Sequence, residues 1–191
     1  IIVSQEVELP KQSETTLIRV EDTRYALAFV SAAWFDHPAK KLTTIGITGT
    51  KGKTTTTYLV KSILENAGRK VGLVGTIEII IGDTHIHAVN TTPESYLLQE
   101  YFAKMVESGC DTVVMEVSSQ ALMLHRTQGF VFDFGIFTNL EPDHIGPNEH
   151  GSFEEYAHCK SLLFQQCRVG IANCDCLLYT SPSPRDRTRS R

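Results

Sequence analysis

The chain has 191 residues, of which 41% are hydrophobic and 21% charged, and its formal net charge at pH 7 is −4. This composition is ordinary for a globular protein, and so mild a charge gives no reason to expect a nucleic-acid partner. No apolar run approaches the roughly 20 residues of a membrane span, and the N-terminus lacks a signal-peptide pattern, so we expect a cytoplasmic protein without a membrane partner. The five cysteines include no C-x-x-C pair, which argues against a zinc site or a disulfide framework.

The first 40 residues contain two short apolar segments and then a helical pattern. In residues 22–35 the apolar side chains recur every three or four positions, and Asp22 is the expected N-cap. Pro38 then breaks the helix. We interpret residues 1–40 as the C-terminal remnant of a small N-terminal α/β domain. Because the chain does not open with Met, we expect it to be a fragment.

From residue 41 onward, strand patterns alternate with helix patterns. Such alternation predicts a mostly parallel sheet with helices on both faces, and we assign it to an incomplete central domain over residues 41–175. A short turn inside this region predicts one β-hairpin. Thr92 is the expected cap of the helix that follows the hairpin, with Pro93 at its first position. The expected strands cover residues 42–48, 71–75, 77–81, 85–89, 112–117 and 132–138, and the expected helices begin at residues 54 and 93.

A glycine-rich loop joins the first of these strands to a helix. Glycines at such a turn let successive N–H groups point at an anion, and the start of the helix adds the positive end of its dipole. Lys53 would reach the terminal phosphates of a nucleotide, and the Thr54 hydroxyl would bind Mg²⁺. The strict pattern G-x-x-x-x-G-K-[ST] is not met, because Ile47 stands at its first position; the match is to the narrower G-T-x-G-K-T-T. The alternative is a structural turn that binds nothing.

Three further polar clusters, at residues 90–94, 116–119 and 139–144, fall at predicted strand or hairpin ends. Ligands of parallel sheets gather at the carboxyl ends of strands, so we expect these clusters to converge with the loop on one cleft. Glu116 ends an apolar run, where a carboxylate needs a compensating cation such as Mg²⁺ on nucleotide phosphates. Alternatively, Glu116 caps the next helix. For His144, a metal-ligand role and a structural role both remain open.

Taken in order, these motifs resemble those of the Mur ligases, over nearly all of residues 16–175. Within that family, the resemblance is strongest to the members that add the third residue of the peptidoglycan stem peptide. It implies ATP-dependent amide ligation of an amino acid to UDP-MurNAc-L-Ala-D-Glu through an acyl phosphate, in a monomeric enzyme. The motifs are Gly49–Thr55, Asn90–Glu94, Met115–Ser119, Thr138–Leu140 with Asp143-His144, and Phe153–Lys160.

The resemblance also implies roles for individual residues. Thr54 and Glu116 would hold one Mg²⁺, and His144 would hold a second together with Lys160, carbamylated by carbon dioxide. Local sequence alone favours a solvated helix lysine at position 160. The implied catalytic residues are Lys53, Glu116, His144 and Lys160; the ATP-binding residues are Gly49, Thr50, Lys51, Gly52, Lys53, Thr54 and Thr55; the substrate-binding residues are Asn90, Thr91, Thr92, Ser118 and Arg126.

Two positions depart from the family's pattern. Lys51 stands where the family usually has Asn, and Leu124 stands where some relatives have a polar substrate contact. The family match places the incoming amino acid in a C-terminal domain outside this sequence. These residues therefore do not distinguish lysine from meso-diaminopimelate as the added residue, and we expect the fragment itself to be inactive.

Three other functions remain open. A folylpolyglutamate synthase shares the phosphate loop, and a non-catalytic nucleotide-binding module would need no Lys160. A P-loop kinase or GTPase is the third, although the guanine-specific Asn-Lys-x-Asp motif is absent from the sequence. Residues 176–191 are rich in Ser, Pro and Arg and show no apolar periodicity, so we expect a non-native or disordered tail there.

Overall fold

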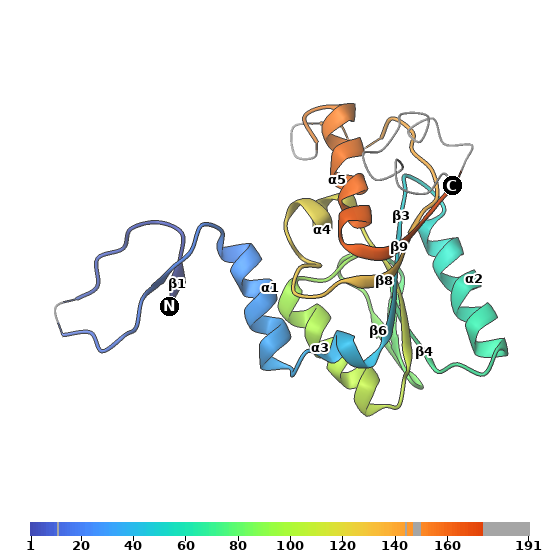
Figure 1. Ribbon diagram of the computed structural model, residues 1–191, viewed down its shortest axis with the longest axis horizontal. Helices are drawn as coiled ribbons and strands as arrows, with labels where there is room; N and C mark the ends of the chain where they lie inside the picture. The colour runs from blue at the N-terminus through green and yellow to red at the C-terminus, as the bar shows by residue number, and fades with distance from the viewer. Residues whose placement is uncertain (11, 144, 147–149, 174–191) are drawn as a thin grey trace, which may run out of the picture.

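The computed structural model describes residues 1–10, 12–143, 145–146 and 150–173. Its centre is a seven-stranded sheet covered by helices on both faces, preceded by a small N-terminal part (Figure 1). The strand order is β6-β5-β4-β7-β3-β8-β9. In sequence order the strands are β3 (Thr43–Thr48), β4 (Val71–Val74), β5 (Glu78–Ile81), β6 (Thr84–His87), β7 (Thr112–Glu116), β8 (Phe132–Phe137) and β9 (Cys167–Ala172).

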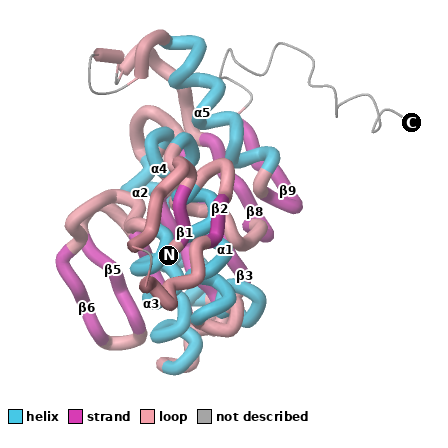
Figure 2. The backbone as a smooth tube through the Cα atoms, turned by 90° about the vertical axis from the view of Figure 1, so that its left-hand side faces the viewer, coloured by secondary structure: helices cyan, strands magenta, loops and turns pink. Residues whose placement is uncertain are grey.

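Five of these strands run parallel, and β5 and β6 form an antiparallel hairpin. The hairpin lies at one edge of the sheet, opposite β8 and β9 (Figure 2). Every residue of β7 is buried, as expected for a central parallel strand with both faces covered. The predicted mostly parallel sheet with one hairpin is therefore confirmed. The sequence had not indicated β9.

Two apolar layers hold the helices to the sheet. On one face, α2 (Lys53–Asn66) packs Val60 and Leu64 against Ile45 and Ile47 of β3. On the other face, α3 (Ser95–Glu107) and α5 (Phe153–Gln165) enclose a larger core. The side chains of this larger core include Leu98, Phe102, Met105, Val113, Met115, Phe132 and Leu163.

One helix start differs from its prediction. The expected helix after β3 begins at Lys53 and ends before Gly68, whose φ is +84°. By contrast, α3 begins at Ser95 with Glu94 in the N-cap position, so Thr92 is not a cap. The Thr92 hydroxyl is fully buried and instead donates to the Glu116 carbonyl at 2.9 Å. A tertiary hydrogen bond at the end of β7 thus replaces the local bond that the capping pattern suggested.

The N-terminal part contains β1 (Ile2–Val3) paired in parallel with β2 (Ile18–Arg19), followed by α1 (Thr23–Trp34) and a 3₁₀ turn, η1 (Pro38–Lys41). Asp22 caps α1 as predicted, because its carboxylate accepts the N–H groups of residues 24 and 25. α1 packs on the outer side of α3 (Figure 1). The domain boundary at residue 40 stays a prediction. Within the described residues, no helix is both long and apolar enough to cross a membrane.

Candidate functional site

The glycine-rich loop runs from the end of β3 into the first turn of α2. Gly49 and Gly52 have φ angles of +148° and +77°, which residues with a side chain rarely adopt. Lys53 donates its amine to the carbonyl oxygens of Gly49 and Thr50, at 2.9 and 3.1 Å. Burial lowers the pKa of Lys53. The loop therefore combines backbone N–H groups, a helix N-terminus and a half-buried amine, which suits a phosphate group.

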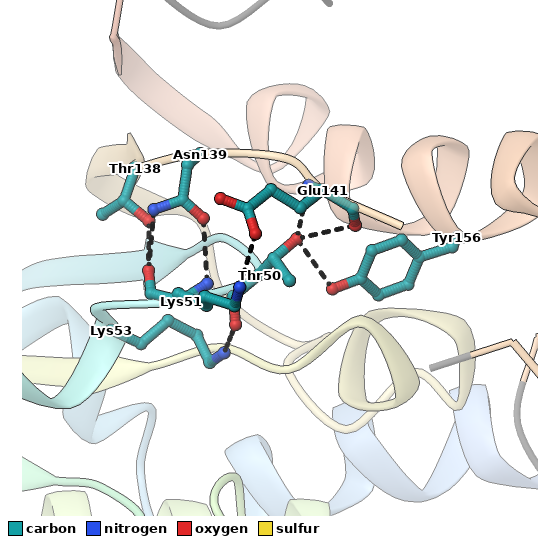
Figure 3. Close-up of polar contacts among 7 residues, drawn as sticks. All are labelled: Thr50, Lys51, Lys53, Thr138, Asn139, Glu141 and Tyr156. Carbon is teal, nitrogen blue, oxygen red and sulfur yellow. Dashed lines mark hydrogen bonds and ion pairs between the residues drawn. The ribbon is translucent and has the colours of Figure 1, made fainter. Parts of the chain in front are cut away.

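The segment after β8 holds this loop in place (Figure 3). The side-chain amide of Asn139 accepts the Lys51 N–H at 2.9 Å and donates to the Lys51 carbonyl at 3.0 Å. Thr138 also donates to that carbonyl, at 3.0 Å, and Glu141 forms an exposed ion pair with Lys51 at 2.5 Å. Asn139 and Glu141 of the predicted cluster, together with the preceding Thr138, thus support the glycine-rich loop. His144 lies outside the described residues.

The two loop glycines give a stability prediction. A Cβ atom on Gly49 would lie 2.0 Å from the Thr138 hydroxyl, whereas one on Gly52 would meet no atom within 4 Å. Both substitutions to alanine incur backbone strain of about 1–3 kcal/mol, but only Gly49→Ala adds a clash. We expect a lower melting temperature for both variants, with the larger drop for Gly49→Ala. Equal melting temperatures for the two variants would show that Thr138 does not constrain Gly49.

Glu116 ends β7, and its side chain is buried, with 1% of the residue exposed. One carboxylate oxygen, Oε2, accepts the hydroxyls of Thr54 at 3.0 Å and Thr76 at 3.1 Å. Oε1 accepts the Thr76 N–H at 2.9 Å. Within the described part of the chain these partners are neutral and none is a cation. A buried carboxylate beside a threonine hydroxyl offers the hard oxygen ligands that fit Mg²⁺.

The alternative role for Glu116, capping the next helix, is wrong. The cap of α4 (Ser119–Met123) is Ser118, whose hydroxyl accepts the N–H of Ala121 at 3.1 Å. Ser118 also donates its own N–H to the Thr92 hydroxyl at 3.1 Å. The Glu116 carboxylate instead contacts Thr54, at the start of α2 beside the glycine-rich loop.

A pocket of about 230 Å³ opens beside the loop, and several of the expected site residues line it. Among the described residues that line the pocket, three are lysine or arginine and none is acidic. Such a pocket favours an anionic ligand. The predicted convergence is confirmed for Lys53 of the loop, the residues after the hairpin and Ser118, whereas no described residue of the cluster at 139–144 is part of the pocket lining. The lining residues are Lys53, Asn90, Thr91, Thr92, Ser118, Ser119, Gln120, Arg126, His150 and Lys160.

Lys160 reaches this pocket from α5, and only 1% of the residue is exposed. Its amine donates to the Gly49 carbonyl at 2.8 Å, so Lys53 and Lys160 share one acceptor. The amine also lies 4.6 Å from the ring centroid of Tyr156. Burial, followed by the charge of Lys53, lowers the pKa of Lys160 to about 7. The interpretation of Lys160 as a solvated helix lysine is therefore wrong.

Arg126 is held at the rim of the same pocket. Its guanidinium donates to the Thr92 carbonyl at 3.2 Å and pairs with Glu94 at 2.7 Å. Arg24 of α1 pairs with the other oxygen of Glu94, at 3.2 Å. These contacts tie the segment before α3 to both α1 and the loop after α4. They orient Arg126 without removing it from the pocket lining.

Sequence reasoning missed three residues at this site. Thr76 follows the end of β4, so the strand-end rule, applied to this strand as well, would have included it. Tyr156 lies four residues before Lys160, the helical spacing that brings two side chains together. Its hydroxyl donates to Thr50 at 3.1 Å (Figure 3). His150 is buried and lies 2.8 Å from the Ser119 hydroxyl through Nε2; no pattern in the sequence marked it.

Comparison with known proteins finds relatives over most of the chain. A family model described as the Mur ligase middle domain matches residues 47–182. The UDP-N-acetylmuramoyl-L-alanyl-D-glutamate–2,6-diaminopimelate ligase of Clostridium perfringens is 49% identical over 175 residues, covering 92% of this chain and 35% of the relative. Ligase 1 of the same description from Clostridium acetobutylicum is 49% identical over 169 residues, covering 88% of this chain and 35% of the relative. The chain thus spans about a third of the length of these relatives.

Solved structures give the same picture at the level of the fold. A structure of a UDP-N-acetylmuramoyl-L-alanyl-D-glutamate–2,6-diaminopimelate ligase matches with a TM-score of 0.79 at 25% identity, covering 92% of this chain and 35% of that chain. Mycobacterium tuberculosis folylpolyglutamate synthase complexed with ADP matches with a TM-score of 0.57 at 14% identity, covering 80% and 41%. This second likeness concerns the fold alone.

Proposed function

Because the chain belongs to the Mur ligase family, we propose that the protein of which it is part is an ATP-dependent amide ligase, a UDP-N-acetylmuramoyl-tripeptide synthetase. It would join the amine of diaminopimelate to the D-glutamate carboxylate of UDP-MurNAc-L-Ala-D-Glu. The added amino acid is inferred from the names of the relatives at 49% identity. The observation that carries the proposal is the meeting of the phosphate loop, two lysines and the residues Asn90–Thr92 in one pocket without a lining carboxylate among the described residues.

The residues support phosphoryl transfer followed by amide formation. ATP phosphates would lie against the loop from Gly49 to Thr55, with the Lys53 amine directed to the γ-phosphate. Transfer of that phosphoryl group to the substrate carboxylate releases ADP and leaves an acyl phosphate. The incoming amine then forms the C–N bond as phosphate leaves and the amine loses its proton. Such transfers need alignment and charge neutralisation more than covalent help from the protein.

Thr54 and Glu116 are the residues that would hold Mg²⁺. When bound, the ion neutralises phosphate charge and helps to align the phosphoryl group. The two side chains already contact each other, at 3.0 Å, at the mouth of the loop. Asn90, Thr91, Thr92, Ser118 and Arg126 would bind the sugar and peptide of the substrate, because amide and hydroxyl groups suit these ligands and a guanidinium suits a carboxylate or diphosphate oxygen.

The surroundings of Lys160 favour carbamylation. A neutral amine can add to carbon dioxide, forming an N–C bond and releasing a proton to solvent. The product is an anion with two oxygens, which would turn the repulsion between Lys53 and Lys160 into an attraction. His144, which the family resemblance places beside this group, stays a prediction. That the protein is monomeric and cytoplasmic also stays a prediction. Sedimentation of the full-length protein would test whether it is a monomer.

The test uses the full-length protein. With UDP-MurNAc-L-Ala-D-Glu, diaminopimelate, ATP and Mg²⁺, we expect ADP release that depends on all four components. Lysine in place of diaminopimelate should support a much slower rate. Glutamylation of folate instead would identify a folylpolyglutamate synthase, and ATP binding without ADP release under either condition would identify a non-catalytic nucleotide-binding module.

A further inference from the structure

Thr76 holds both oxygens of the Glu116 carboxylate. Its backbone N–H donates to Oε1 at 2.9 Å, and its hydroxyl donates to Oε2 at 3.1 Å. Gly75 makes this approach possible, because a Cβ atom there would lie 2.6 Å from Oε1. The carboxylate therefore rests on the backbone at the end of β4, in an orientation set by one neighbouring residue.

The direction of the hydroxyl bonds is determined by the carboxylate. An ionised carboxylate only accepts hydrogen bonds, so the Thr76 proton points to Glu116. The contact of 3.0 Å between the hydroxyls of Thr76 and Thr91 must then have Thr91 as its donor. Thr54 donates to the same Oε2, at 3.0 Å. Thr91 and Thr76 thus form a directed chain that ends on Glu116, and Thr54 donates to the same oxygen separately; members of such a chain polarise and strengthen one another.

We propose that Thr76 is a positioning residue that orients the Glu116 carboxylate for the metal ion of the bound nucleotide. The proposal rests on the proposed function, because it takes Glu116 and Thr54 as the metal-binding pair. Hydrogen bonds from outer partners fix the orientation of metal-binding side chains, and their loss typically weakens metal binding by about 10–100-fold. Of the Thr76 side chain, the hydroxyl and not the methyl group makes the contact with the carboxylate.

The experiment measures metal binding directly. Mn²⁺ is titrated into the full-length protein in the presence of a non-hydrolysable ATP analogue, and free Mn²⁺ is followed by its electron paramagnetic resonance signal. The variants are Thr76→Val, which keeps the shape of the side chain, Thr76→Ser, which keeps the hydroxyl, and Thr84→Val. Thr84 is the matched control, because it is an exposed threonine in the hairpin, away from the pocket lining.

We expect Thr76→Val to weaken Mn²⁺ binding by about tenfold or more, with Thr76→Ser and Thr84→Val within about threefold of the parent protein. Melting temperatures should differ little among them, because Thr76 is exposed. Thr76→Ala serves as a second hydroxyl-free variant if Thr76→Val does not fold. Unchanged Mn²⁺ binding in a folded hydroxyl-free variant, or binding by Thr76→Ser as weak as that of Thr76→Val, overturns the inference.

Failure of the proposed function has a different signature. In that case the parent protein itself binds no Mn²⁺ together with the nucleotide analogue, and the inference falls with it. If the parent protein binds both ligands, only the comparison between the Thr76 variants decides the role of Thr76.

Discussion

Replacing Lys53 with alanine should reduce ADP release by the full-length protein by about 1,000-fold or more. The Lys53 amine lies at the phosphate loop, where it contacts the Gly49 and Thr50 carbonyls. Charge that develops on the transferred phosphoryl group would lose the Lys53 cation, and removal of such a group from a preorganised site commonly costs this much rate. The effect should fall mainly on kcat, because the backbone of the loop still binds phosphate.

Lys104→Ala is the matched control for this variant. Lys104 lies on α3, is about half exposed and pairs with Glu100 at 2.6 Å, so its removal should change neither the rate nor the fold by much. Melting curves of both variants exclude unfolding as the cause of lost activity. An active Lys53→Ala protein would show that this lysine does not serve phosphoryl transfer.

Lys160 should be as necessary for ADP release as Lys53, and the activity of the full-length protein should depend on carbon dioxide. We expect Lys160→Ala to be inactive, because the buried amine can no longer become a carbamate. Short carboxylic acids should restore part of the rate by entering the space left behind. Removal of carbon dioxide from the buffers should lower the activity of the parent protein, and added bicarbonate should restore it.

The pKa of Lys160 gives this dependence a direction in pH. With a pKa of about 7, about one amine in ten is neutral at pH 6 and about nine in ten at pH 8. Only the neutral amine adds carbon dioxide, so half-maximal reactivation should need more dissolved carbon dioxide at pH 6 than at pH 8. Above pH 8 the requirement should continue to fall, but less steeply, because the amine is already neutral and only the proton released with the carbamate still makes the equilibrium depend on pH. Reactivation that is independent of pH, or an active Lys160→Ala protein in carbon-dioxide-free buffer, would contradict the proposed carbamate.

The residues of the proposed site come from elements that are remote in sequence. Lys53 begins α2, Glu116 ends β7 and Lys160 lies in α5, and they meet because the carboxyl ends of the parallel strands lie on one edge of the sheet. The chain therefore contains much of the proposed nucleotide and substrate site. The proposed activity belongs to the longer protein, since the chain covers 35% of its relatives.

The amino-acid sequence by itself determined the order of the strands from β3 to β8, the hairpin and the glycine-rich turn from β3 into α2, whereas it had not indicated β9. These features depend on local patterns: the period of apolar residues, glycine at positive φ and the Lys-Thr pair at a helix start. The strand-end rule also brought Lys53, Asn90–Thr92 and Ser118 together correctly, because parallel strands place their carboxyl ends on the same side.

Only the tertiary structure decided the environment of individual side chains. Local sequence at Lys160 is that of a solvated helix lysine, yet packing of α5 against the loop buries its amine and lowers its pKa. The Thr92 hydroxyl does not cap the helix, as its neighbours suggested, but donates to the Glu116 carbonyl at the end of β7. Burial, shared acceptors and long-range hydrogen bonds arise from contacts between distant segments, and no local pattern records them.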